Sequence, residues 1–123
     1  MSHFAKAIAL NPAISRAHLN LGVALVKQGK AAAAIEPLRE AARLNPQSPQ
    51  ASYYLGSVYA AQNRFAEAED WFNQTLRIEP NFAPAHQSLA QLLALQGRQA
   101  EAARHYQEAL RLMRQGGGAA VAQ

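Results

Sequence analysis

The sequence predicts an all-α fold, an α-solenoid of antiparallel helix pairs, and three observations support this prediction. A segment with the pattern of Ala17–Gly22 recurs 34 residues later at Ala51–Gly56 and again at Ala85–Ala90. Each of these segments is followed by a glycine or asparagine turn, and each of the first two repeats closes with a proline. A period of this length is typical of a repeat array whose unit is one helix pair that cannot bury its apolar face alone.

Each unit is predicted to contain two helices separated by a short inner turn. The turns centre on Gly29, Asn63 and Gly97, because these residue types enter the left-handed conformation at low cost and end a helix there. A proline ends the second helix of the first two units, since it disfavours helical geometry in the residue before it. Pro37 falls inside a second helix, where we expect a local kink. The first helices are expected over residues 15–28, 49–62 and 83–96, and the second helices over 31–45, 65–79 and 99–115.

The packing of these helices depends on columns of small and large residues that repeat with the units. Two helices approach closely only where neither carries a bulky side chain, and large side chains fill the space beside the contact. The small columns are Gly22, Gly56 and Ala90, then Ala34, Ala68 and Ala102; the large columns are Leu21, Leu55 and Leu89, then Leu25, Tyr59 and Leu93, then Leu38, Phe72 and Tyr106.

The repeat register divides the chain into three complete units, residues 13–46, 47–80 and 81–115. Residues 1–12 are predicted to be the second helix of a partial preceding unit, and residues 116–123, which begin with three glycines, a flexible tail. Such arrays usually need capping helices with a polar outer face. We therefore expect either a piece of a longer array or a protein that covers its open ends by self-association. The residues predicted for that oligomer interface are Phe4, Ile8, Leu110 and Met113.

The repeated pattern resembles the tetratricopeptide repeat, whose consensus is W-x-x-L-G-x-x-Y, then A-x-x-x-F, then P. The resemblance covers nearly the whole chain, as three full repeats plus a partial one at the N-terminus, and it implies a right-handed superhelix. The tryptophan column departs from the consensus, because His18, Ser52 and His86 fill it. Unit two matches best, through Leu55, Gly56, Tyr59, Ala68, Phe72 and Pro80.

The resemblance also implies a function, that of a non-catalytic protein–protein interaction scaffold. In the family, the first helices line the concave face and bind a peptide or helix of a partner protein. Asparagine and glutamine suit a peptide backbone because each both donates and accepts hydrogen bonds, and tyrosine offers stiff contact area. The alternative is that one tyrosine packs between helices and the polar residues are merely solvated. No carboxylate clamp is expected, because Pro84 and Ser88 stand where cations would be needed. Carried over residue by residue, the groove would be lined by Arg16, Leu19, Asn20, Val23, Lys27, Gln50, Tyr53, Tyr54, Ser57, Gln87, Ser88 and Gln91.

The formal net charge of +4 suggests another function, a cationic surface for nucleic acid or acidic lipid. Arg43, Arg77 and Arg111 form a column near the ends of the second helices, each three residues after a glutamate or glutamine. This spacing puts partners on one helix face and is typical of a solvated surface. If acidic neighbours neutralise the column, the hypothesis loses support, and we rank nucleic acid below a protein partner.

The residues used by enzymes and metal sites form no recognisable constellation in the sequence. The chain has no cysteine and four histidines, of which His86 and His105 lie on adjacent predicted helices and could approach each other. Neither an H-E-x-x-H pair nor a phosphate-binding glycine loop is present. We therefore predict no enzyme activity, no cofactor and no metal site. The longest apolar runs are too short to span a bilayer, so we expect a soluble segment of unknown compartment.

Overall fold

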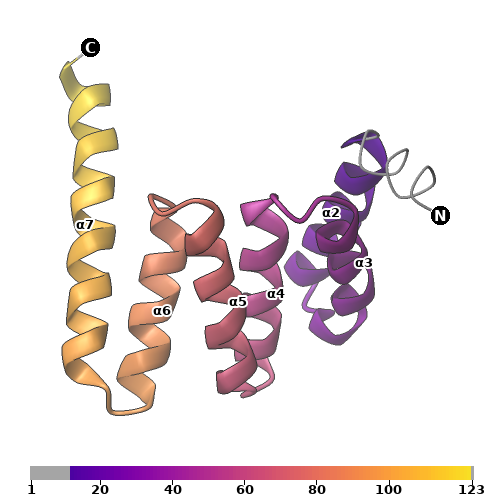
Figure 1. Ribbon diagram of the computed structural model, residues 1–123, viewed down its shortest axis with the longest axis horizontal. Coiled ribbons are helices and arrows are strands. Elements are labelled where there is room, and N and C mark those ends of the chain that lie inside the picture. Colours follow the sequence, from indigo (N-terminus) through magenta and orange to yellow (C-terminus); the bar gives the residue numbers. More distant parts are fainter. Residues whose placement is uncertain (1–11, 123) are drawn as a thin grey trace.

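The structure is a computed structural model that describes residues 12–122. The described residues form six helices that run up and down in succession, which confirms the predicted all-α class (Figure 1). The helices are α2 (Pro12–Lys27), α3 (Ala31–Leu44), α4 (Pro49–Ala61), α5 (Phe65–Ile78), α6 (Ala83–Leu95) and α7 (Gln99–Ala122).

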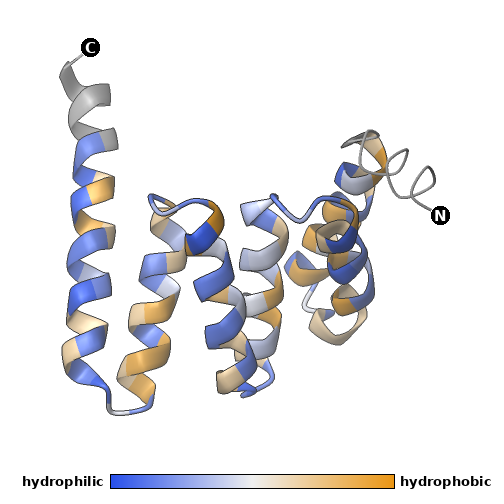
Figure 2. Cartoon of the chain, viewed as in Figure 1, coloured by the Kyte–Doolittle hydropathy of each residue, from blue (hydrophilic) through white to orange (hydrophobic). Residues whose placement is uncertain are grey.

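The helices pack as consecutive antiparallel pairs, α2 with α3, α4 with α5, and α6 with α7. The pairs stack because α3 also contacts α4 and α5 also contacts α6. The first helices of neighbouring pairs meet more extensively than the second helices do, since α4 touches both α2 and α6. The molecule is therefore a single row of pairs, with apolar residues between the helices and polar residues on their outer faces (Figure 2).

The inner turns have the predicted left-handed residue at their centre. The backbone φ angle is 77° at Gly29 and at Gly97, and 62° at Asn63. The amide of the next residue donates back to a carbonyl in the last turn of the first helix, as from Arg64 to Tyr59 at 2.9 Å. This bond pairs a carbonyl that the end of the helix would leave without a partner.

The core is a continuous apolar cluster that runs along the stack. The small columns have the predicted purpose: a Cβ added at Gly56 would lie 2.7 Å from the Phe72 ring, and one at Gly22 would lie 2.5 Å from the Leu38 side chain. Glycine at these positions therefore lets the two helices of a pair close onto a large side chain. Leu38 and Phe72 are almost completely buried.

Two members of the large columns are more exposed than predicted. Leu21 is 53% exposed and Tyr106 is 51% exposed. Leu21 lies on α2, the first helix of the described residues, and Tyr106 lies on α7, the last, so each lacks the neighbouring pair that covers its counterparts. Ala90 also carries the Cβ that Gly22 and Gly56 lack.

The helix ends differ from the prediction at both ends of the array. α2 begins at Pro12 rather than near Ser15, and proline suits a first helical turn because its missing N–H has no partner there. α7 continues to Ala122 through the three glycines, where we predicted a helix end near Gln115 and a separate tail. Glycine lowers helix stability by about 1 kcal/mol relative to alanine but does not forbid the conformation. Phe4 and Ile8 lie outside the described residues.

Candidate functional site

Four of the predicted groove residues line one pocket at the junction of the first two pairs. Arg16, Leu19 and Asn20 reach it from α2, and Gln50 reaches it from the start of α4. The pocket has a volume of about 460 Å³ and is closed on its other side by the α3–α4 loop. Its remaining lining residues are Ser15, Asn45, Gln47, Ser48 and Pro49.

Three further groove residues meet between the second and third pairs. Ser57 of α4 and Ser88 and Gln91 of α6 line a pocket of about 230 Å³. Phe65 and Phe72 of α5 also line it, so this pocket is more apolar than the first. Ser57 is partly engaged within its own helix, because its hydroxyl donates to the Tyr53 carbonyl oxygen at 3.0 Å.

The two tyrosines are both half-buried and belong to a cluster of aromatic rings. The Tyr53 ring lies 5.9 Å from Phe72 and 5.5 Å from Phe82, measured between ring centroids. Tyr54 meets Tyr53 edge to face at 5.3 Å. Tyr53 is therefore a packing residue of the α4–α5–α6 junction, as the alternative interpretation of the tyrosine pair required, and Tyr54 lies half-buried beside it.

The remaining groove residues are scattered. Val23 is half-buried and Lys27 is exposed in the last turn of α2, and neither lines either of the two pockets described above. Gln87 of α6 lines a small cavity of about 60 Å³ with Leu110 and Met113 of α7. Leu110 and Met113 are among the exposed large apolar residues of the chain.

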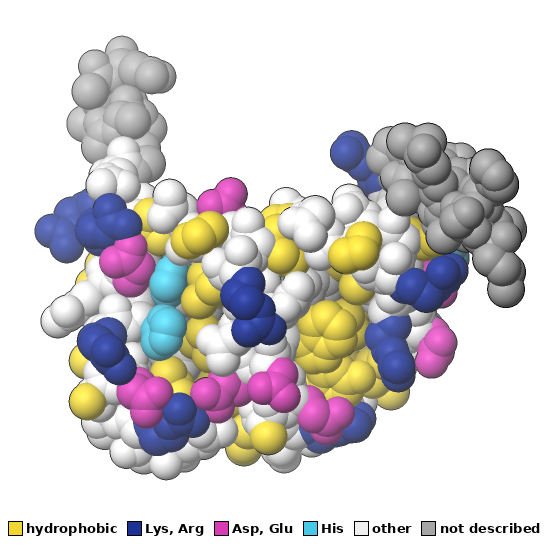
Figure 3. Space-filling view, in the orientation of Figure 1, with side chains coloured by type: hydrophobic (Ala, Val, Ile, Leu, Met, Phe, Trp, Pro, Cys, Tyr) yellow, Lys and Arg dark blue, Asp and Glu magenta, His cyan; other side chains and the backbone are white. Residues whose placement is uncertain are grey.

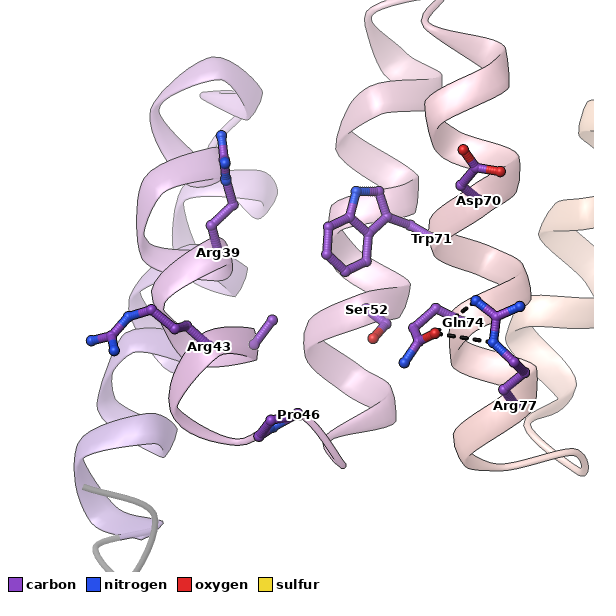
Figure 4. A pocket seen from close by; sticks show the side chains of 9 residues that line it. Arg39, Arg43, Pro46, Ser52, Asp70, Trp71, Gln74 and Arg77 are labelled. Carbon is purple, nitrogen blue, oxygen red and sulfur yellow. Dashed lines mark hydrogen bonds between the residues drawn. The ribbon is translucent and has the colours of Figure 1, made fainter. Parts of the chain in front are cut away.

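Sequence reasoning missed the largest pocket described, which lies between the second helices α3 and α5. It has a volume of about 520 Å³. Trp71 projects from α5 toward α3, and Ser52 of α4 lies at the back between them (Figure 4). One feature of the sequence could have indicated this pocket, because Trp71 is the only tryptophan of the chain. The other lining residues are Arg39, Ala42, Arg43 and Pro46 from the α3 side, and Asp70, Gln74 and Arg77 from α5.

His86 and His105 come together as the sequence allowed. Their Nδ1 atoms are 3.0 Å apart, and His86 Nε2 lies 2.9 Å from the carbonyl oxygen of Pro80. A carbonyl only accepts, so Nε2–H of His86 donates to it, and His105 Nδ1–H donates to Nδ1 of neutral His86. Burial lowers the pKa of His105, and repulsion from a protonated His86 and from Arg104 lowers it further.

Arginines and glutamates pair along the outer helix faces, and both signs of charge lie side by side over one face of the molecule (Figure 3). Arg43 pairs with Glu40 and Arg111 with Glu108, and these hydrogen bonds lower the pKa of both carboxyl groups. Arg77 bonds instead to the neutral Gln74. Acidic neighbours therefore neutralise two of the three arginines in the column, which weakens the nucleic-acid hypothesis.

The described part of the chain offers little for metal binding or membrane insertion. Within residues 12–122, no three His, Asp or Glu side chains gather closely enough to hold a metal ion. Among the helices of the same range, none is both long enough and apolar enough to cross a membrane.

Comparison with known families finds one match that covers most of the chain. A family model of the tetratricopeptide repeat matches residues 2–49 and 24–84. A second model of the same family matches residues 87–115. A comparison with curated proteins found no match.

Solved structures with the same fold include two proteins. A structure of MamA superposes with a TM-score of 0.79 at 28% identity, over 90% of this chain and 65% of that one. The chain thus spans less than two thirds of the length of this relative. The second repeat domain of Spaghetti (RPAP3), bound to the HSP90 peptide SRMEEVD, superposes with a TM-score of 0.80 over 85% of this chain and 96% of that one. Its identity is 18%, so this likeness concerns the fold alone.

Proposed function

Because the chain belongs to the tetratricopeptide repeat family of protein–protein interaction modules, we propose that it is a non-catalytic scaffold that binds a peptide or helix of a partner protein along its first helices. The observation that carries this proposal is the pocket between α2 and α4, in which four of the residues expected to line the groove meet.

The chemistry of this pocket suits an extended peptide. The side chains of Asn20, Asn45, Gln47 and Gln50 each offer a donor and an acceptor, and peptide backbone needs both. Arg16 adds one cation at the rim, which favours a carboxylate on the bound segment. The RPAP3 structures hold a peptide in a fold of this kind, although their low identity carries over no residue of this chain.

The first helices also offer an apolar contact one repeat further along the chain, between α4 and α6. The pocket lined by Ser57, Ser88 and Gln91 has aromatic rings in its wall, and Tyr54 lies on the helix that separates the two pockets. A bound segment that follows the first helices would place polar backbone over α2 and α4 and an apolar side chain near α6. This arrangement combines orientation by hydrogen bonds with burial of apolar surface.

A capture experiment with matched variants tests the groove. The full chain is immobilised beside an Asn20→Ala, Gln50→Ala variant, a Tyr54→Ala, Gln91→Ala variant, and a Gln107→Ala control on the exposed side of α7. All must have the circular dichroism spectrum of the parent. A protein from the source lysate that the parent and the control retain, and that either groove variant loses, supports the proposal. Equal retention by every variant contradicts it.

A second candidate function is self-association through α7. Tyr106, Leu110 and Met113 recur at helical spacing, are each more than 40% exposed and line one small cavity together. Large apolar side chains gathered on one helix face are typical of an interface. Sedimentation over a range of concentrations tests this candidate: a mass that rises with concentration, and that Leu110→Lys with Met113→Lys returns to the monomer value, supports it. A monomer at all concentrations contradicts it.

A further inference from the structure

The α3–α5 pocket differs in two side chains from the equivalent junction of the next repeat. The equivalent junction one unit further along lies between α5 and α7, where His86, His105 and Pro80 occupy the columns that Ser52, Trp71 and Pro46 occupy here. In that junction the two imidazoles meet and His86 bonds to the Pro80 carbonyl, so the His86 ring lies between the helices. Ser52 is too small to do the same, and a cavity of about 520 Å³ remains.

The walls of this cavity are cationic. Three arginines, Arg39, Arg43 and Arg77, line it against the single acidic residue Asp70. Arg39 and Arg77 form no ion pair with any residue between 12 and 122, and the hydrogen-bond partner of Arg77 is the neutral Gln74. Arg39 and Arg77 therefore have no direct ion-pair partner among these residues and outnumber Asp70, whereas Arg43 is already paired with Glu40.

The cavity also offers a stiff apolar surface. The indole of Trp71 is half-buried and extends into the space between α3 and α5 (Figure 4). Ala42 of α3 and Pro46 of the following loop also line the cavity. The volume is within the range of about 300–1,000 Å³ seen for ligand pockets. Tryptophan and arginine are also the residue types most enriched among energetically dominant interface positions.

We propose that the α3–α5 pocket is a second binding site, independent of the groove on the first helices, for an acidic peptide segment of a partner protein. An apolar side chain of the segment packs on Trp71 over the space that Ser52 leaves. Carboxylates on either side of that residue pair with Arg39 and Arg77. The pocket is a local concavity with one aromatic ring, which suits a single anchored side chain rather than a run of stacked bases.

The test uses the only tryptophan of the chain as its reporter. A phage-displayed library of random dodecapeptides is selected on the full chain, and enriched peptides are synthesised with acetylated and amidated ends so that no terminal charge contributes. Each peptide is titrated while the fluorescence of Trp71 is recorded. We expect enriched peptides to carry an apolar residue flanked by Asp or Glu, to change the fluorescence on binding, and to bind more weakly as salt is raised.

The decisive variant is Ser52→His, which introduces the residue found at the equivalent position of the next repeat, His86. It should place an imidazole in the cavity, as His86 does beside Pro80, and weaken peptide binding about tenfold or more with unchanged helicity. Asn20→Ala with Gln50→Ala, in the groove of the first helices, is the matched control and should leave the affinity unchanged. If Ser52→His does not fold, the double variant Arg39→Gln, Arg77→Gln, at two exposed positions of the pocket, replaces it and should weaken peptide binding in the same way.

Several results would overturn the proposal. They are the enrichment of no peptide, the enrichment of basic or uncharged peptides, and an unchanged affinity in Ser52→His or in the arginine variant. Loss of binding in the groove control would also overturn it, because the peptide would then lie on the first helices. A fluorescence change with phosphatidylserine vesicles but with no peptide would assign the pocket to a membrane surface instead.

Discussion

At the scale of single residues, the contact between a glycine and a large side chain sets how closely the two helices of a pair approach. Gly56 faces the Phe72 ring and Gly22 faces Leu38 with no room for a further atom. The third pair has Ala90 in this column, and the facing Tyr106 is half exposed.

Gly56→Ala is predicted to destabilise the protein by about 1–3 kcal/mol, the usual range for an overpacked core. The added Cβ would lie 2.7 Å from a Phe72 ring that is 1% exposed and has no space to move. Chemical denaturation measures the change. Phe72→Leu in the same chain is the control, because the smaller side chain should recover part of the loss in a double-mutant cycle. Strictly additive effects would contradict the contact.

The histidine pair predicts a dependence of stability on pH. The pKa of His105 is lowered from its ordinary value of 6.5, so the unfolded chain takes up this proton more readily than the folded one. Stability should be highest above pH 6.5 and fall as the pH decreases through the folded pKa of His105. Glu101 of α7 and Glu69 of α5 oppose this shift, whereas His86 and Arg104 support it.

Thermal unfolding of the parent and of His105→Gln between pH 8 and pH 5 tests the pH prediction. Glutamine does not titrate, and its amide can still donate to His86. The variant should lose the His105 contribution to the fall in stability at acid pH. The same fall in both proteins would show that another group is responsible.

At the scale of the helices, α3 and α7 each contain residues that disfavour a helix. α3 continues through Pro37, which has no N–H for the carbonyl four residues earlier. Leu38, Ala41 and Leu44 of the same helix are buried against the stack, and this packing holds the helix together. Tertiary contacts thus outweigh local propensity in this element.

Pro37→Ala is predicted to stabilise the protein by about 2 kcal/mol. The cost of an interior proline is about 3 kcal/mol, and replacing it returns up to about 1 kcal/mol of entropy to the unfolded chain. The midpoint of thermal unfolding should therefore rise. Glu36→Ala, an exposed position in the same helix, serves as the control and should leave the midpoint nearly unchanged. No rise for Pro37→Ala would mean that α3 accommodates the proline without cost.

At the scale of the whole molecule, the fold is a row in which each pair contacts only its neighbours. The connections between pairs are helix contacts and a few side-chain bridges, such as the ion pair between Arg98 of α7 and Glu69 of α5 at 2.9 Å. Arg98 also pairs with Glu101 at 2.8 Å, and these hydrogen bonds raise the pKa of the guanidinium group. Stability in such an array is approximately a sum of the stabilities of the units and of their interfaces.

Amide hydrogen exchange should therefore be slowest in the middle of the row. α4 and α5 have a helix pair on both sides, whereas α7 has one neighbouring helix layer among the described residues. We expect the amides of α4 and α5 to open with the highest free energy and those of α7 with the lowest. Uniform protection across all six helices would indicate that the array unfolds as one cooperative unit.

The sequence by itself determined the class of fold, the repeat and the turns. Each of these follows from local chemistry, such as a left-handed φ at Gly29 or the spacing of small residues along one helix face. It also predicted that Arg16 and Gln50, which occupy the same column of successive units, lie side by side, and both line the pocket between α2 and α4.

Only the tertiary structure decided which side chains fill their space and which leave it open. Tyr53 and Tyr54 are adjacent in sequence, yet Tyr53 packs against the rings of Phe72 in α5 and of Phe82, the residue before α6. The α3–α5 pocket is lined by Arg39, Ser52 and Trp71 from three helices, and the repeat pattern alone does not show that these side chains leave a cavity between them. Such volumes depend on side chains that meet across units, and packing between units is a property of the assembled stack.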